Sequence, residues 1–153
     1  MIKINVQIHS KSWLKEIKNL NQYFKSKLKK IHKKTTFLKN KNITFTILLT
    51  NSSNIKILNK KFRGKNKPTD VLSFPYFRSS YLKSIKENNI YIGDIAISYE
   101  IIKKRSSKNN FKFEFDKVWI HGLLHLIGYD HIKNKDYFIM ERTEKKILNL
   151  ISK

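Results

Sequence analysis

Short apolar segments with the features of β-strands are distributed over the first two thirds of the chain. Residues 2–8 alternate between apolar and polar side chains, which is the two-residue period of a strand with one buried face. Residues 43–50, with the sequence ITFTILLT, are β-branched and apolar. Two more strands are predicted at residues 70–74 and 90–98, and Gly93 within the latter marks a bulge or a close approach of another backbone. The pattern therefore predicts a sheet of about four strands.

Apolar side chains spaced three and four residues apart predict helices between these strands. The clearest one runs from Ser12 to about His32 and carries lysines on its outer face. Its apolar face consists of Trp13, Ile17, Leu20, Phe24, Leu28 and Ile31. Shorter helices are expected after Ser52 or Ser53, either of which can cap the helix, and over residues 98–106. Residues 76–88 are expected to form an exposed loop.

The helix predicted over residues 114–127 is apolar on nearly all sides, which indicates that it is buried. Gly128 follows and is suited to end it, because glycine readily adopts the left-handed conformation found after helix C-termini. A last helix, over residues 135–151, has one apolar face formed by Tyr137, Met140, Ile147 and Ile151.

The order of these elements predicts an α+β fold in which one mixed sheet packs against helices. A chain of 153 residues can bury a core, and it shows no internal boundary, so residues 1–153 are predicted to form a single domain. The chain has no cysteine, no apolar leader at its N-terminus and no apolar run near the roughly 20 residues that cross a bilayer. These features favour a cytoplasmic protein without a membrane partner.

Positive charge dominates the composition. Thirty-three Lys and Arg residues oppose eleven Asp and Glu residues, which gives a net charge of +22, and no acidic residue lies between Glu16 and Asp70. A field of this sign attracts polyanions, of which nucleic acid fits better than an anionic membrane surface. Lysine accounts for most of the excess, and Asn and Ile are also abundant, so a biased genome composition can explain part of it.

Three of the five histidines lie within HGLLHLIGYDH, at His121, His125 and His131. The first two are one helical turn apart and therefore project from the same face of the predicted helix. A turn at Gly128 can bring His131 back to them. Three neutral imidazoles hold a zinc ion and leave its fourth position open to water, whose pKa falls to about 7, which is the arrangement of a catalytic zinc site. Asp130 either orients one of these ligands or is a turn residue.

The spacing of the three histidines is that of zinc proteases, but Gly122 occupies the position of their glutamate. Because glycine cannot accept a proton, peptide hydrolysis by that route is disfavoured, and a metalloprotease would need a displaced base such as Asp70 or Glu114. Phosphodiester hydrolysis needs instead a nucleophile and cations near the phosphoryl oxygens. A carboxylate at position 122 would also repel an approaching phosphate.

The basic segment KKFRGK, at residues 60–65, is a candidate for contact with a phosphate. The planar guanidinium of Arg63 suits a phosphate better than a lysine ammonium does, although spacing alone does not place it at the histidines. Phe62, Phe74 and Tyr76 flank this segment and can stack on nucleobases. We expect at least two of these three rings to pack in the core.

Two longer blocks of the sequence resemble the YbeY-type endoribonucleases, which are bacterial rRNA maturation factors. HGLLHLIGYDH (121–131) is similar to the family's H-G-x-L-H-L-x-G-Y-D-H, and LNKKFRGKNKPTDVLSFP (58–75) is similar to N-x-x-[FY]-R-x-K-D-x-P-T-D-V-L-S-F-P. A third, shorter block, GDIAIS (93–98), also matches. The order and spacing of the blocks make the resemblance specific. Asn66 stands where the family has aspartate, which leaves any role of that carboxylate open.

The resemblance implies a zinc ion held by His121, His125 and His131, and it marks Arg63 as a functional arginine in a basic channel near the metal. It implies cleavage of single-stranded RNA during rRNA maturation, notably at the 3′ end of small-subunit rRNA, and in ribosome quality control, with ribosomal subunits and assembly factors as partners. The expected RNA-binding lysines are Lys60, Lys61, Lys65 and Lys67. The alternatives are a zinc metalloprotease with a displaced base and a non-catalytic RNA-binding factor of ribosome assembly.

Overall fold

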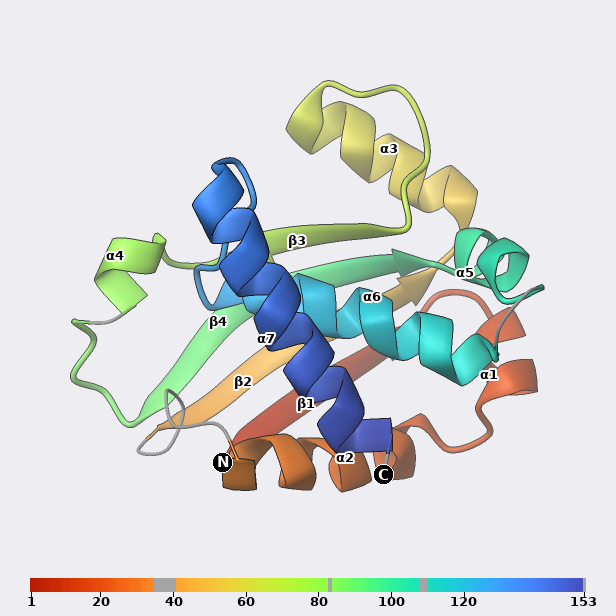
Figure 1. Ribbon diagram of the computed structural model, residues 1–153. Helices are drawn as coiled ribbons and strands as arrows, with labels where there is room; N and C mark the ends of the chain where they lie inside the picture. Colours follow the sequence, from red (N-terminus) through yellow and green to blue (C-terminus); the bar gives the residue numbers. More distant parts are fainter. Residues whose placement is uncertain (35–40, 83, 108–109, 153) are drawn as a thin grey trace.

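Four strands form one mixed sheet in the order β1–β2–β4–β3 (Figure 1). The structure is a computed structural model that describes residues 1–34, 41–82, 84–107 and 110–152. The parallel strands are β1 (Ile2–Ile8), β2 (Asn42–Thr50) and β4 (Asn89–Ser98), and the antiparallel edge strand is β3 (Val71–Pro75). The predicted mixed sheet of about four strands is confirmed. Pro75 extends β3 one residue beyond its predicted end, because an edge strand tolerates a residue without an N–H.

Gly93 lies where β4 approaches its neighbours most closely. Its φ is +132°, and a Cβ atom there would lie 2.2 Å from the carbonyl oxygen of Phe74. The register between β2 and β4 also shifts between Thr44 and Thr46, across from this glycine. Gly93 is therefore both a bulge and a point of close approach, the two roles predicted for it.

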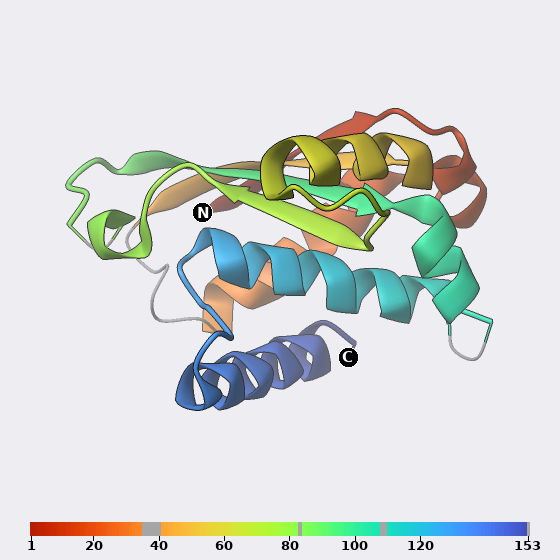
Figure 2. The same cartoon turned by 90° about the horizontal axis from the view of Figure 1, so that it is seen from above.

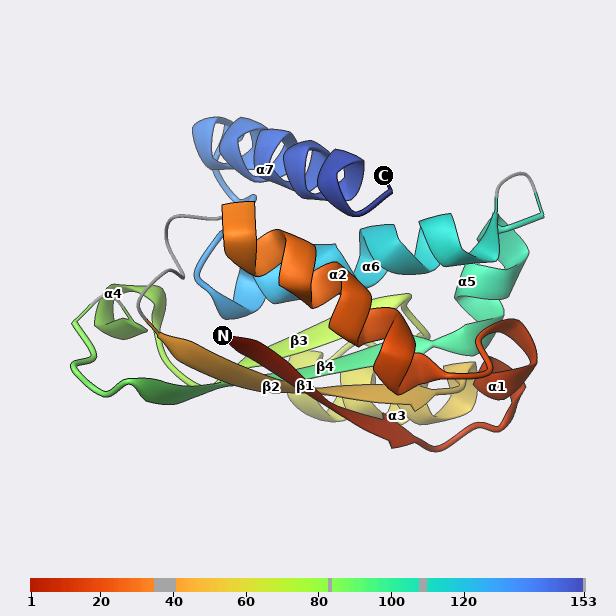
Figure 3. The same ribbon diagram turned by 90° about the horizontal axis from the view of Figure 1, so that it is seen from below.

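Helices cover both faces of the sheet. α2 and α6 lie on one face with α7 outside them (Figure 2). α3 lies on the other face (Figure 3), where it contacts β3 and β4. The helices are α1 (Ser12–Glu16), α2 (Leu20–Lys34), α3 (Ser52–Arg63), α4 (Ser79–Leu82), α5 (Tyr99–Arg105), α6 (Phe111–Leu126) and α7 (Asn134–Ser152). The predicted α+β layers are confirmed.

Each face of the sheet has its own apolar core. The larger core lies under α2, α6 and α7 and includes Trp13, Phe24, Phe45, Phe115 and Trp119. The smaller core lies under α3 and consists of Ile55, Leu72 and Ala96. Each large side chain buried in this way contributes about 1.5–3 kcal/mol. Since most of α6 is buried, as its apolar sequence predicted, the sheet holds this helix in a fixed position.

The single helix predicted from Ser12 to His32 is wrong, because two helices occupy this range. Ile17 is extended, with φ −136° and ψ 98°, and it ends α1. α2 then begins where the Asn19 side chain accepts a hydrogen bond from the backbone N–H of Gln22 at 2.9 Å. A local polar cap therefore overrides the continuous helical periodicity.

Two assignments near α3 and α4 also change. The cap of α3 is Asn51, whose side chain accepts a hydrogen bond from the N–H of Asn54 at 2.9 Å, and not Ser52 or Ser53. The predicted loop over residues 76–88 contains the short helix α4.

The apolar face of α7 differs from the predicted one at a single position. Met140, Ile147 and Ile151 are buried as expected. Tyr137 is 49% exposed, so its assignment to this face is wrong, and Leu148 completes the face.

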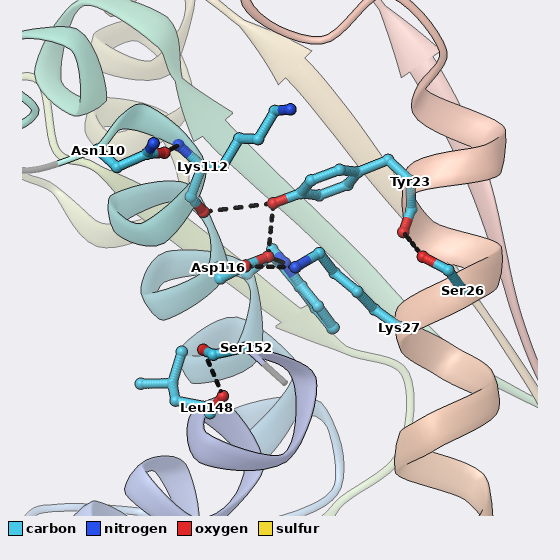
Figure 4. A network of polar contacts seen from close by, with 9 residues as sticks. Tyr23, Ser26, Lys27, Asn110, Lys112, Asp116, Leu148 and Ser152 are labelled. Carbon is cyan, nitrogen blue, oxygen red and sulfur yellow. Dashed lines mark hydrogen bonds and ion pairs between the residues drawn. The ribbon is translucent and has the colours of Figure 1, made fainter.

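A polar network around Asp116 ties α6 to α2 (Figure 4). The Asp116 carboxylate accepts hydrogen bonds from the Tyr23 hydroxyl (2.7 Å) and the Trp119 indole (2.8 Å), and its other oxygen pairs with the Lys27 ammonium (2.6 Å). Burial and the Asp116 charge raise the pKa of Tyr23, which keeps its hydroxyl a donor. Because Asp116 is buried, losing its partners would leave its charge unpaired, so the network fixes α6 relative to α2.

Among the described residues, no helix combines the length and apolar character needed to span a membrane.

Candidate metal centre

The C-terminal end of α6 and the turn after it bring three histidines together. His121 and His125 project from one face of α6. The N–H of Gly128 donates to the carbonyl of His125 (3.1 Å), and the N–H of Tyr129 donates to the carbonyl of Leu124 (3.0 Å). These bonds, with the positive φ of Gly128, form a Schellman turn that reverses the chain. The turn returns His131 to the cluster, and one nitrogen from each ring lies within 4.8 Å of the others.

The hydrogen bonds of two rings direct their Nε2 atoms to a common point. The Nδ1 atom of His125 faces the carbonyl oxygen of Tyr129 at 3.1 Å, and Nδ1 of His121 faces the Glu144 carboxylate at 3.1 Å. Because both oxygens can only accept, each Nδ1 carries the proton and a neutral ring keeps its lone pair on Nε2.

The Nε2 atoms of His121 and His125 lie 3.1 Å apart, which is a distance that fits a shared cation. Bonds of 2.0–2.1 Å at a tetrahedral angle separate two ligand nitrogens by about 3.3 Å. Two lone pairs at this distance repel each other unless a positive charge lies between them. The donor set and its geometry therefore fit a metal ion.

Burial and neighbouring charge keep His125 neutral. Burial, followed by the charges of His121 and His131, lowers the pKa of His125 from 6.5 to about 4. Its imidazole therefore has a free lone pair at neutral pH, which is the form that binds a metal.

The metal-free protein is expected to lose stability as pH falls from about 6.5 to about 4. In this range the unfolded chain protonates His125, whose ordinary pKa is 6.5, whereas the folded chain keeps it neutral down to about 4. Protons therefore favour the unfolded state in this window, and His125 adds no further loss below it. Urea unfolding of chelator-treated wild type and His125→Asn, at about pH 7 and about pH 4.5, measures the difference. An equal loss in both proteins contradicts the assignment.

Glu144 is a site residue that the sequence did not indicate. It comes from α7, which packs against α6, and its contact with His121 spans 23 positions in the chain. No local spacing marks it, since the contact exists only once α7 has docked. A carboxylate on the outer nitrogen of a metal-binding imidazole fixes the ring and increases its basicity.

Replacing Glu144 by glutamine is expected to weaken metal binding about 10–100-fold. The amide keeps an acceptor for the ring but removes the negative charge. Competition with a chelator measures the affinity directly, independently of any activity. Glu141→Gln is the matched control, because Glu141 is on the same helix and pairs with the exposed Lys145 instead. Equal affinities of the two variants would remove Glu144 from the site.

Asp130 lies in the turn between the second and third histidines. Its carboxylate accepts a hydrogen bond from the backbone N–H of His131 at 2.7 Å. This bond shapes the turn that carries His131, which is the plainer of the two roles considered for Asp130. Orientation of an imidazole ring by Asp130 stays a prediction.

Gly122 faces the sheet rather than the metal centre. A Cβ atom there would lie 2.9 Å and 3.0 Å from side-chain atoms of Ile95 and 3.2 Å from the Ser73 hydroxyl. A carboxylate at this position would enter the sheet, so the expectation that it would add negative charge where a phosphate approaches is wrong. Glycine is required here because α6 packs closely against β3 and β4.

The two displaced bases considered for a protease lie elsewhere. Asp70 forms an ion pair with Arg105 at 2.5 Å and lines a hollow with Arg63 on the α3 side. Glu114 is buried near the start of α6, about 10 Å along the helix from His121 at 1.5 Å per residue.

The basic residues predicted to bind RNA are divided between two hollows beside α3. Arg63 ends α3, is exposed, and lines one hollow with Lys65 and Lys67. Lys60 and Lys61 line the other, which also includes Asn66. α3 and α6 lie on opposite faces of the sheet (Figure 2). The structure thus brings the three histidines together, but it leaves Arg63 and the neighbouring lysines on the other side of β3.

The aromatic residues near the arginine are more exposed than expected. Phe62 is 57% exposed and stacks edge to face against the partly buried Phe74, with ring centroids 5.1 Å apart. Tyr76 is 69% exposed. The expectation that at least two of the three pack in the core is wrong, because β3 is an edge strand and its flanks remain open to solvent.

Comparisons with known proteins agree over nearly the whole chain. The family model described as "Endoribonuclease YbeY" matches residues 5–152. An endoribonuclease YbeY of Pelagibacter ubique is 48% identical, covering 99% of this chain and 97% of the relative. One of Buchnera aphidicola is 42% identical, covering 94% and 90%.

A solved structure shows the same fold. The solution structure of a Thermotoga maritima protein is 29% identical and superposes with a TM-score of 0.60, covering 99% of this chain and 89% of that one. The sequence matches reach well beyond the three histidines, and they include the segments that form the sheet. The chain belongs to the endoribonuclease YbeY family.

Proposed function

We propose that this protein is a metal-dependent endoribonuclease that cleaves single-stranded RNA during rRNA maturation, including the 3′ end of small-subunit rRNA. The match of residues 5–152 to the endoribonuclease family carries this proposal. The histidine cluster supports it by offering ligands for a catalytic metal, and the net charge of +22 supports it by attracting a polyanion.

Zinc is the proposed metal, with His121, His125 and His131 as its ligands. The cluster found among the described residues consists of imidazoles alone, a donor set that suits zinc and leaves a tetrahedral position open. When bound, the ion supplies Lewis acidity, which polarises a phosphoryl oxygen and makes water more acidic. The protein holds the rings in place through Glu144 and the Tyr129 carbonyl.

The basic residues are proposed to guide the RNA around the edge strand β3. The Arg63 guanidinium makes no hydrogen bond or ion pair within the described part of the chain, so it is available for a phosphate next to the scissile one. Lys65 and Lys67 share its hollow, and Lys60 and Lys61 extend the basic surface along α3. Because such contacts release counterions, RNA affinity is proposed to fall steeply with salt.

The geometry gives less support to the metalloprotease hypothesis. Gly122 faces the sheet, Asp70 is paired with Arg105, and Glu144 occupies the outer side of the His121 ring. None of these positions places a base at the open side of the metal centre. A non-catalytic assembly factor would share the basic surface, so activity must be measured to separate it from the enzyme.

A cleavage assay on metal-loaded and chelator-treated protein tests the proposal. Chelation should abolish cleavage of single-stranded RNA and zinc should restore it. Arg63→Ala should slow cleavage about 100-fold with unchanged metal content, and Arg63→Lys, which keeps the charge but not the planar fork, should recover only part of it. Cleavage by metal-free protein, or zinc-dependent proteolysis of casein, would refute the proposal. Normal ribosome maturation with both His121→Ala and Arg63→Ala would favour the non-catalytic factor.

Ribosomal subunits and their assembly factors are the proposed partners, and the cytoplasm is the proposed location. Both follow from the proposed substrate, because precursor rRNA is matured within assembling subunits.

A further inference from the structure

Four aromatic side chains form a cluster on the surface where β3 ends and α4 begins. The cluster consists of Tyr76, Phe77, Tyr81 and Tyr91. The ring of Tyr76 lies 4.8 Å from that of Phe77 and 6.1 Å from that of Tyr91, and Phe77 lies 5.5 Å from Tyr81. The four rings line one open hollow.

Core packing does not account for the two outer members of this cluster. Tyr76 is 69% exposed and Tyr81 is 58% exposed. Ile85 and Ile90 line the same hollow and are buried. The hollow therefore combines buried apolar residues with two tyrosines that remain largely open to solvent, as an aromatic recognition surface does.

The segment that carries the cluster lies next to the end of α6 that carries two of the three histidines. The Cβ position of Gly93 is 3.0 Å from the backbone nitrogen of Tyr76 and 3.1 Å from the Leu126 side chain, so both approach the same point of β4. Leu126 directly follows His125. Figures 1 and 2 agree on this placement, since α4 lies next to the C-terminal end of α6 in both views.

We propose that this aromatic cluster is a stacking platform for the bases of single-stranded RNA next to the cleaved bond. The inference rests on the proposed function and adds a binding site to it. Aromatic rings stack on any base, because every base has a π-face. Arg78, which is exposed and adjacent to Phe77, supplies a cation for the strand's phosphates at the same place.

A platform of this kind selects single strands over duplexes. In a duplex the base faces are already stacked on one another, so they cannot lie on Tyr76 or Tyr81 without first being unstacked. The basic surface along α3 attracts both forms of RNA through their phosphates. The aromatic cluster therefore provides a preference for unpaired RNA that charge alone does not.

Binding of a short 2′-O-methyl oligoribonucleotide, measured by fluorescence anisotropy, tests the platform. Tyr76→Ala and Tyr81→Ala should each weaken binding on the order of tenfold, whereas Tyr76→Phe, which keeps the ring, should leave it unchanged. Phe113→Ala is the matched control, because Phe113 is also an exposed aromatic, 43% exposed, but lies in the first turn of α6. Equal affinity of Tyr76→Ala and wild type would overturn the proposal.

Oligonucleotides that lack one base test stacking directly. Removing the base that lies on Tyr76 should weaken binding to wild type but have no further effect on Tyr76→Ala. The same penalty in both proteins would overturn the proposal. Tyr81→Trp provides a second readout that does not depend on truncation, since Trp13 and Trp119 are fully buried and the new indole would report quenching by a stacked base. No quenching at saturating RNA would also count against it.

These measurements separate this inference from the proposed activity. If wild type binds RNA through the tyrosines but does not cleave, the platform stands and the proposed endonuclease function fails. If wild type cleaves RNA but neither Tyr76→Ala nor Tyr81→Ala weakens RNA binding, the proposed function stands and the platform fails.

Discussion

Replacing His121 by alanine is expected to abolish both metal binding and RNA cleavage while leaving the chain folded. Its ring supplies one of three nitrogens within 4.8 Å of one another, and it is the ring held by Glu144. Loss of a direct ligand should weaken metal binding by more than the roughly 10–100-fold that is typical of losing a residue that supports a ligand. Because His121 is only partly buried, the substitution leaves no large cavity. Metal content by mass spectrometry and the rate of RNA cleavage measure the two effects.

His9→Ala is the matched control for this experiment. His9 follows β1 and is exposed, and its backbone N–H, rather than its ring, bonds to Leu49. The control should bind metal and cleave RNA as wild type does. Full cleavage by His121→Ala, at unchanged melting temperature, would show that the catalytic centre lies elsewhere.

The three-histidine cluster could be predicted from the sequence because its geometry is local. A spacing of four residues on a helix places His121 and His125 together, and a glycine after the helix permits the turn that returns His131. Glu144 could not be predicted in this way. Its position depends on how α7 docks, and the apolar face of α7 does not specify which of its acidic residues meets α6.

The position of Arg63 relative to the histidines could not be predicted from the sequence either. The basic segment and the histidine segment both flank the sheet, but a strand pattern does not say which face each helix will cover. The structure places α3 on the face opposite α6, with the edge strand β3 between them. Phe62 and Tyr76 lie at the edge strand β3 and are exposed, because nothing in the described chain covers that edge of the sheet.

Periodicity predicted which residues of the N-terminal helical region are buried better than it predicted the helices themselves. Trp13, Ile17, Leu20, Phe24, Leu28 and Ile31 are all buried, although the backbone is not helical at Ile17. The apolar positions therefore encode one buried face. The break after α1 depends on the Asn19 cap. A single capping residue is a weaker sequence signal than a long series of periodic apolar positions.

Gly122→Glu restores the glutamate of zinc proteases, and it is expected to unfold the chain rather than create a protease. The side chain would enter the sheet, where its Cβ alone comes within 2.9 Å of the fully buried Ile95. Burial of an unpaired carboxylate costs several kcal/mol, and overpacking adds about 1–3 kcal/mol. Together these approach the roughly 5–15 kcal/mol by which a domain of this kind is stable.

Gly122→Ala isolates the steric part of this effect. It should destabilise the chain by about 1–3 kcal/mol, less the roughly 1 kcal/mol gained in helix propensity. Ile95→Ala removes the atoms that the new Cβ meets, so the double variant should be more stable than the sum of the single changes predicts. Urea unfolding of the variants measures this coupling. If Gly122→Glu melts like wild type, position 122 does not face the sheet, and the glycine would then have to be explained by the chemistry of the site.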